Sequence, residues 1–494
     1  MICPSTRSFP KIIKFIFFYA CFYFYFVLLF SRNIGDNDLW GYLSFGGIFW
    51  EEGYFPYRDV FSYTPTKPLW VYHEWLTGVF FYYIFNSSGP AGLQLLHYVI
   101  IIVTISLIYL TALKRGGKPL SAFIALIPAM LLISFGYPPV RAQVFTYLFF
   151  ILTLYILESA KKTGNWSVLW WLLPIQVLWC NLHGGFVAGL GLILFYALGE
   201  GLSRREAVPY IKVMIPAAFV TLINPYGFNY WTYMWKAVLM PRPEIDEWVS
   251  VIAALKNNVQ DVPVLIFVFL SLVLTVSLIF RRKRNLTDLL IIAVTLFLGY
   301  KSIRHGVLFG LIFGAYLPII LSEYWEAWRA RALFFTRPSW RPQAFPVLLL
   351  FLIYLWINPS LSLTMAPSFH ILTPSPYFPM GAIKWIKEKG LKGNILPHFD
   401  WGEFLIWTCY PSCRVAMDGR YETVYEEEFS REYFDFQAGR GNWKTFLRKY
   451  PHEMVLLKAN TKTHLLMLRE PSWQVVYSDQ GSVLFLRKKT GDRN

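Results

Sequence analysis

The sequence predicts an all-α polytopic membrane bundle of about eleven transmembrane helices, followed by a small C-terminal α/β domain on the non-cytoplasmic side. Three observations predict it: the composition, a series of long apolar runs, and a change in character after about residue 358. Of the 494 residues, 55% are hydrophobic and only 15% are charged, whereas a soluble protein of this length carries roughly a quarter of its residues charged. Lipid must therefore solvate the apolar excess.

Each predicted transmembrane helix is a run of mostly apolar residues close to the roughly 20 that cross a hydrocarbon core about 30 Å thick. The first run resembles a signal peptide, but it is too long for an h-region and no small-residue cleavage site follows, so it is predicted to be retained. The eleven runs are residues 12–30, 91–113, 119–136, 142–159, 166–182, 184–200, 207–223, 261–280, 286–300, 305–322 and 343–357.

The formal charge of +16 would indicate a nucleic-acid partner in a soluble protein, but here the basic residues cluster between helices. With a cytoplasmic N-terminus, every such cluster falls on the cytoplasmic side, as the positive-inside rule requires. The sequence therefore predicts a bacterial inner-membrane protein with membrane lipids, and no nucleic acid, as partners. The clusters are Lys114, Arg115 and Lys118; Lys161 and Lys162; Arg204 and Arg205; Arg281, Arg282, Lys283 and Arg284; and Arg329, Arg331, Arg337 and Arg341.

The outward loops differ from these basic loops. The first, residues 31–90, is long, and its segment 74–86 is too short to span, so it is predicted to form an aromatic-rich helix at the outer interface. The loop belongs to the membrane domain, residues 1–357. Its acidic residues are Asp36, Asp38, Glu51, Glu52, Asp59 and Glu74.

The C-terminal part begins after a proline-punctuated linker, residues 358–379, and covers residues 380–494. Alternating patterns predict a small α/β layer on the periplasmic side. Helices are expected at 380–389, 402–408, 426–437, 442–449 and 462–469, and strands at 393–398, 413–417, 453–457, 473–478 and 482–487. Cys409 and Cys413 lie four apart in this domain, where an oxidising compartment permits a disulfide; two unpaired thiols are the alternative.

Candidate site residues converge on the outer ends of the helices, where carboxylates could act as a general base or bind a divalent metal and arginines suit a phosphate. Each has a structural alternative: an Asx cap for the aspartates, a snorkelling anchor for the arginine at 141, a tight turn beside Gly184-Gly185, and a helix cap at 73–74. The candidates are Asp36, Asp38, His73, Glu74, Arg141, His183, Asn224, Glu247, Arg304 and His305.

Several motifs together resemble a bacterial membrane family described as glycosyltransferase-like, of the GT-C class. They are Asp36-Asn-Asp38-Leu-Trp40, Gly53-Tyr-Phe-Pro-Tyr-Arg-Asp59, Trp70-Val-Tyr-His73-Glu74-Trp75, Asn181-Leu-His183-Gly-Gly-Phe186, Asn224-Pro-Tyr-Gly227 and Met417-Asp418-Gly-Arg420-Tyr-Glu422. The resemblance covers nearly the whole chain.

The resemblance implies a GT-C-like bundle that transfers a sugar from a polyprenyl-phosphate carrier to a lipid, glycan or protein on the outer face. It implies Asp36 as the acidic residue of the first external loop, with Asp38 as the alternative; the arginine assignments rest on topology alone. Rival interpretations are a transporter or flippase of a lipid-linked glycan, an O-antigen ligase or polymerase, and a catalytically inactive assembly partner. A transporter should place its ionisable residues near the bilayer midplane, whereas these gather at one surface.

Overall fold

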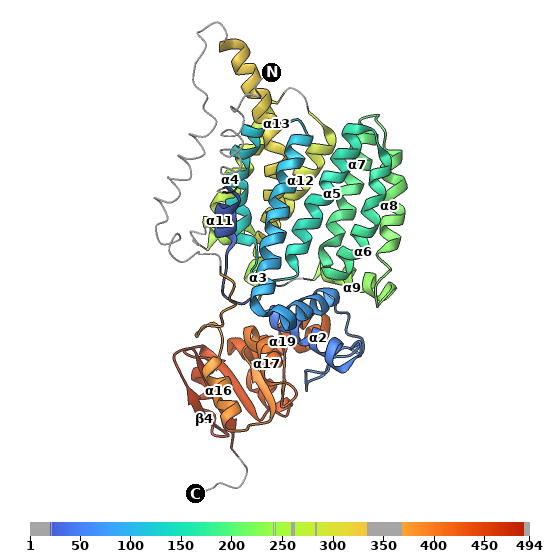
Figure 1. Cartoon of the computed structure of the whole chain (residues 1–494). Coiled ribbons are helices and arrows are strands. Elements are labelled where there is room, and N and C mark those ends of the chain that lie inside the picture. Colours follow the sequence, from blue (N-terminus) through green and yellow to red (C-terminus); the bar gives the residue numbers. More distant parts are fainter. Residues whose placement is uncertain are drawn as a thin grey trace, which may run out of the picture.

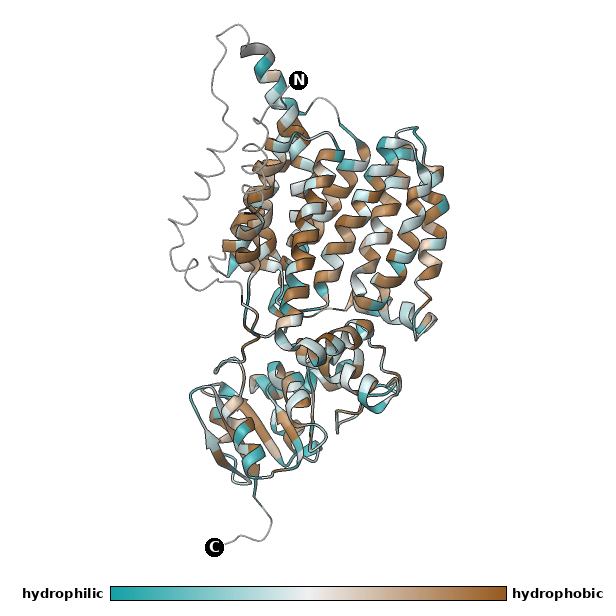
Figure 2. Ribbon diagram, in the orientation of Figure 1, coloured by the Kyte–Doolittle hydropathy of each residue, from teal (hydrophilic) through white to brown (hydrophobic). Residues whose placement is uncertain are grey.

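The computed structural model describes residue 20 and residues 22–240, 242, 244–257, 262–281, 284–332 and 368–488. A helical bundle occupies one end of the molecule and a small sheet domain the other, with residues 31–90, predicted as the first external loop and called so below, between them (Figure 1). Hydrophobic residues dominate the ribbon of the bundle, whereas hydrophilic and hydrophobic residues are mixed along the sheet domain (Figure 2). The chain is thus a multi-pass membrane protein.

The bundle helices are α3 (Trp75–Lys114), α4 (Pro119–Gly136), α5 (Gln143–Thr163), α6 (Leu172–Leu182), α7 (Val187–Leu202), α8 (Val208–Val220), α9 (Phe228–Leu239), α10 (Val251–Lys256), α11 (Val262–Phe280), α12 (Leu286–Lys301) and α13 (Gly306–Ala332). They include two that were not predicted, α9 and α10, between the predicted runs 207–223 and 261–280.

The predicted number of eleven spans is not confirmed. Among the described residues, six helices are long and apolar enough to cross a membrane, and the segments Trp166–Leu182 and Val208–Val220 are shorter apolar helices. Of the first predicted span only part is described, as a helix over residues 22–30, and the span at 343–357 lies outside the described residues.

The predicted interfacial segment and the second predicted span are joined in α3, which bends sharply between them. Gly89 has a φ of 61° and a ψ of −160°, a conformation that favours glycine, and Pro90 follows it without a backbone N–H to continue the ladder. The bend turns the start of α3 across the end of the bundle that faces the sheet domain (Figure 1).

The first external loop also contains α2 (Leu39–Gly47) and a π-helical turn, Ile48–Glu52. Almost all of α2 is buried. It packs against the start of α3 on one side and α17 (Gly402–Cys409) of the sheet domain on the other. The loop is therefore an ordered layer that connects the two ends of the molecule.

The C-terminal sheet has five strands in the order β2-β1-β3-β5-β4. The first three are parallel and the last two antiparallel, with Ile395 opposite Val415 and Leu456 opposite Leu484. The strands are β1 (Gly393–Pro397), β2 (Cys413–Val415), β3 (Met454–Lys458), β4 (Trp473–Ser478) and β5 (Ser482–Arg487).

Helices flank this sheet. Five lie close to their predicted positions: α16 (Met380–Glu388), α17, α19 (Glu427–Ala438), α20 (Lys444–Lys449) and α21 (Lys462–Met467), whereas the short helix α18 (Tyr421–Val424) was not predicted. Buried side chains such as Ile395, Leu456 and Leu484 supply the core. The alternating pattern of this part of the sequence thus predicts all of its strands and all of its helices except α18.

Candidate functional site at the end of the bundle that faces the sheet domain

Arg141 occupies the centre of a cluster of charged side chains on the side of the bundle that faces the sheet domain. Its Nη1 lies 2.9 Å from Glu247 Oε1 and its Nε 3.8 Å from Asp36 Oδ1, while its Nη2 contacts Asp38. Arg304 Nη1 approaches the other Glu247 oxygen at 3.1 Å. The structure thus brings together five residues that the sequence places on four separate connections.

Asp36 combines a local hydrogen bond with this cluster. Its Oδ1 accepts a hydrogen bond of 3.0 Å from the backbone N–H of Asp38, so the predicted Asx turn is present. Because that turn uses only Oδ1, the second carboxylate oxygen is left for another partner. The capping interpretation and a chemical role are therefore compatible at this residue.

The environments of Asp36 and Glu247 displace their pKa values in opposite directions. Burial raises the pKa of Asp36 to about 7, and Arg141 opposes this increase. Burial also disfavours ionised Glu247, but Arg141 and Arg304 outweigh it and lower that pKa to about 2. Near neutral pH, Glu247 is a fixed anion whereas Asp36 is poised to exchange a proton.

A second group of side chains surrounds Glu74. His183 Nε2 lies 3.3 Å from Glu74 Oε1 and His73 Nε2 3.7 Å from it, while the Tyr42 hydroxyl donates a hydrogen bond of 3.0 Å to Oε2. The Nδ1 of His183 accepts a hydrogen bond of 2.9 Å from the backbone N–H of Gly185. This contact assigns the ring proton to Nε2, where it faces Glu74.

Burial, reinforced by His73 and Arg304, lowers the pKa of His183 well below its usual value. Burial also raises the pKa of Glu74. A neutral imidazole therefore faces a carboxyl group that resists ionisation.

Asn224 and His305 have structural partners instead. Asn224 Oδ1 accepts a hydrogen bond from the Tyr226 N–H at 2.8 Å, and its Nδ2 donates to Thr221 O at 2.7 Å. The His305 ring packs edge-on against Trp248, with centroids 5.6 Å apart. Substrate binding by either residue stays a prediction.

Glu403 is a member of the site that the sequence analysis did not single out. It lies at the start of α17, and its Oε2 accepts a hydrogen bond of 3.0 Å from the backbone N–H of Gly41 in α2. A Cβ atom at Gly41 would lie 2.2 Å from that oxygen, so the contact requires glycine. Burial, with Asp38 and Asp418 nearby, raises the pKa of Glu403 well above its usual range.

A buried ion-pair cluster fixes the sheet domain to the first external loop. Arg420 lies 2.7 Å from both Asp59 and Asp418, and all three side chains are at most 2% exposed. The guanidinium also stacks over the rings of Phe61 and Trp70. Two of the recognised motifs, at 53–59 and 417–422, thus meet in space, although they are about 360 positions apart.

A cavity of about 800 Å³ opens between the first external loop and the sheet domain. Asp36 and Asn37 line it on the bundle side, and Asp400 and Lys458 line it on the other. Arg32 adds a further cation. Asp36 therefore belongs to both the charged cluster and the cavity wall.

The predicted divalent metal has no evident position. Among the described residues, no group of three or more His, Cys, Asp or Glu side chains is placed to hold one. Arg141 contacts Asp36, Asp38 and Glu247, so a guanidinium occupies the point where these carboxylates converge. This arrangement of side chains therefore does not fit a metal ion.

The predicted disulfide is absent from the structure, where Cys409 and Cys413 are free, buried thiols. They contact each other: a hydrogen bond from Cys413 lowers the pKa of Cys409 to about 7. The same contact, with burial, raises the pKa of Cys413. The sequence left two unpaired thiols open as the alternative to a disulfide, and the structure shows that alternative.

No family model and no curated protein matches the chain. The solved structures do provide matches. An archaeal oligosaccharyltransferase, AglB from Archaeoglobus fulgidus, in complex with an inhibitory peptide and a dolichol-phosphate, aligns with a TM-score of 0.54 and 12% identity, over 94% of this chain and 72% of that chain. This chain has a GT-C-like membrane fold.

A second structure is ArnT from Cupriavidus metallidurans bound to undecaprenyl phosphate. It aligns with a TM-score of 0.46 and 13% identity, over 98% of this chain and 99% of that chain. The 12% identity with AglB shows a similar fold and nothing of the activity.

Proposed function

We propose that this protein is a membrane glycosyltransferase that moves a sugar from a polyprenyl-phosphate carrier to a lipid, glycan or protein acceptor. The proposal rests on the position of the Asp36 carboxyl group. Its pKa is raised to about 7, it lies next to Arg141, and it lines a cavity of about 800 Å³. A general base is most effective when its pKa lies near the working pH. The fold supports the proposal, because AglB was solved with dolichol-phosphate.

In the proposed reaction, the acceptor hydroxyl donates its hydrogen bond to Asp36 Oδ2. As its oxygen attacks the anomeric carbon, the proton passes to Asp36 and the bond from that carbon to the phosphate oxygen breaks. The polyprenyl phosphate leaves with the electron pair, and attack from the opposite face inverts the anomeric centre. The proton later returns to solvent through the cavity.

Arg141 and Arg304 hold Glu247 between two guanidinium groups, the arrangement that also suits a phosphate. The Glu247 side chain is 42% exposed, so it can leave without exposing a buried core. We infer that the donor phosphate displaces Glu247 from this pair, next to Asp36. Arg32 and Lys458 then add positive charge to the cavity wall.

The extracytoplasmic orientation is part of the same proposal. The basic clusters support a cytoplasmic position for the opposite end of the bundle, and in this orientation the site lies on the face where nucleotide sugars are absent. A transferase working there needs a lipid-borne donor, whose phosphate lies at headgroup level.

The test compares envelope glycans and polyprenyl-phosphate sugars by mass spectrometry in a deletion strain carrying the wild-type gene, Asp36→Asn or Asp246→Asn. Asp246 is an exposed carboxylate beside Glu247, so its variant is a matched control. We expect wild type and Asp246→Asn to restore a sugar that the deletion lacks, and Asp36→Asn at equal expression to fail. If Asp36→Asn restores the sugar, Asp36 is only a cap and a transporter or assembly partner becomes the better interpretation.

A further inference from the structure

A second cavity, of about 390 Å³, lies at the opposite end of the bundle. It is bounded by the end of α3, the end of α5, the loop after α7, the end of α11 and the start of α12. The positive-inside rule places this end in the cytoplasm. The proposed transfer chemistry uses none of its residues.

The floor of this cavity is a buried network of ion pairs. Arg115 contacts Glu158 and lies 2.7 Å from Asp288, and the three side chains are at most 8% exposed. Arg281 approaches Asp288 at 3.6 Å and Glu323 at 2.9 Å. Each carboxylate of the floor is therefore neutralised by an arginine.

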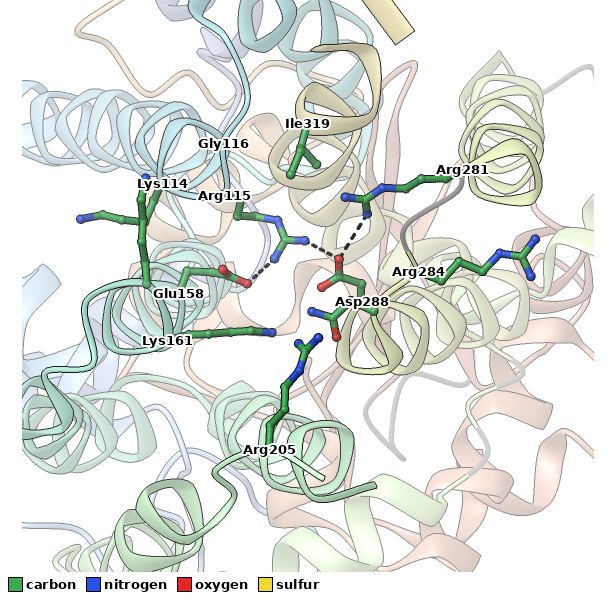
Figure 3. Close-up of a pocket in the computed structure, with 12 residues that line it drawn as sticks. Lys114, Arg115, Gly116, Glu158, Lys161, Arg205, Arg281, Arg284, Asp288 and Ile319 are labelled. Atoms are coloured by element: carbon green, nitrogen blue, oxygen red, sulfur yellow. Dashed lines mark hydrogen bonds and ion pairs between the residues drawn. The ribbon is translucent and has the colours of Figure 1, made fainter. Parts of the chain in front are cut away.

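Further cations surround this floor with too few carboxylates to balance them. Lys161 and Arg205 share one partner, Glu200, at 2.6 and 3.8 Å. Figure 3 shows Lys161, Arg205 and Arg281 pointing toward Asp288 from different sides.

Among the described residues, Lys114, Lys162 and Arg284 have no carboxylate within 4 Å. Seven basic and two acidic side chains line the cavity. A net positive charge remains even when Glu200 and Glu323, which pair with lining cations, are counted.

An unused hydrogen-bond donor lies in the same floor. Arg115 Nε is buried and has no hydrogen-bond partner among the described residues. Surplus positive charge at a bundle end favours an anion, and arginine forks match the oxygens of a phosphate. Basic pockets between transmembrane helices on the cytoplasmic side are suited to anionic lipid headgroups.

We propose that this cavity binds the phosphate headgroup of an anionic phospholipid from the cytoplasmic leaflet. The open cavity accommodates a phosphate with a short polar substituent, and the acyl chains lie along the apolar surface of the neighbouring helices. The lipid neutralises the surplus charge and ties α3, α5 and α12 together. Inorganic phosphate shares the chemistry but lacks the chains.

The experiment titrates delipidated, detergent-solubilised full-length protein at constant ionic strength. Its ligands are phosphatidylglycerol, phosphatidylcholine with the same chains, and inorganic phosphate, and the thermal unfolding temperature is recorded. The double variant Arg205→Gln/Arg284→Gln removes two cations that lie outside the buried floor, and the Arg205 side chain is 56% exposed. The matched control is Arg204→Gln, at an exposed neighbouring position that does not line the cavity.

We expect phosphatidylglycerol to stabilise wild type and Arg204→Gln alike, and to bind the double variant roughly 30-fold more weakly, since each basic group near an anionic lipid contributes about 1 kcal/mol. Native mass spectrometry should show a phospholipid retained by wild type and depleted from the double variant. An equal response of double variant and control would overturn the proposal, as would equal stabilisation by phosphatidylcholine. Equal stabilisation by inorganic phosphate would assign the cavity to the free anion and overturn the lipid.

Discussion

Arg420→Met should detach the sheet domain from the first external loop. The substitution keeps most of the side-chain volume but removes the charge that Asp59 and Asp418 share, at 2.7 Å each. Both carboxylates are at most 1% exposed, so neither regains water unless the interface opens. The stacking of the guanidinium on Phe61 and Trp70 is lost as well.

Breaking a buried ion pair by removing one partner costs about 3–5 kcal/mol, so we expect the docked state to lose about 4 kcal/mol. Since every 1.4 kcal/mol is a factor of ten, the open population should rise on the order of 10³-fold. The matched control is Arg431→Met, because Arg431 pairs with Glu427 at 3.1 Å with both side chains 69% exposed. Exposed pairs at this spacing contribute about 0.3–0.5 kcal/mol.

The assay is limited proteolysis at low protease concentration, where the cleavage rate follows the population of the open form. Cleavage in the first external loop and at residues 368–379 should accelerate strongly in Arg420→Met and hardly in Arg431→Met. Similar cleavage rates for both variants would refute the view that this buried cluster holds the domain in place.

Three further predictions concern the site. Because Asp36 must be ionised to accept a proton and its pKa is raised to about 7, the initial rate of transfer should rise as pH increases through 7; a rate that falls from pH 6 to 8 would contradict this. Glu247→Ala should tighten the binding of undecaprenyl phosphate to the purified protein, because it removes the carboxylate that occupies both arginines; weaker binding would contradict the displacement. The free energy of unfolding of Glu403→Gln should lie within about 1 kcal/mol of wild type. That of Glu403→Leu should fall by about 1–3 kcal/mol, because the leucine leaves the buried Gly41 N–H without a hydrogen-bond acceptor. Equal unfolding midpoints for the two variants would contradict the role of that hydrogen bond.

Much of the site could be predicted because topology alone gathers the ends of alternate helices on one face. Asp36, Arg141, Glu247 and Arg304 belong to different connections between helices. Connections alternate between the two ends of the bundle along the chain, so counting the helices is enough to place these four residues at the same end. Most helices and strands of the sheet domain could also be predicted, because alternation of apolar and polar residues and the presence of turn residues are local signals in the sequence.

The contacts of the sheet domain could not be predicted, because they join residues about 360 positions apart and leave no periodicity in the sequence. In the sequence, Glu403 is an ordinary acidic residue in the first turn of a predicted helix. Only the structure shows that it accepts a hydrogen bond from Gly41. The Asn224 side chain closes a local turn, and the substrate contact that its motif suggested stays a prediction. The number of spans is not confirmed, because two predicted spans form shorter apolar helices and two others lie partly or wholly outside the described residues.

The most direct test of the central claim follows the donor itself. Lipid extract from the deletion strain, which should accumulate the unused polyprenyl-phosphate sugar, is incubated with purified wild type or Asp36→Asn and an envelope fraction, and polyprenyl phosphates are measured by mass spectrometry. We predict that wild type converts the sugar-linked carrier to free polyprenyl phosphate, with an equal amount of sugar in the acceptor, and that Asp36→Asn does not. The claim of transfer at Asp36 would be contradicted if folded wild-type protein left the sugar-linked carrier unchanged. It would also be contradicted if both proteins consumed the carrier equally.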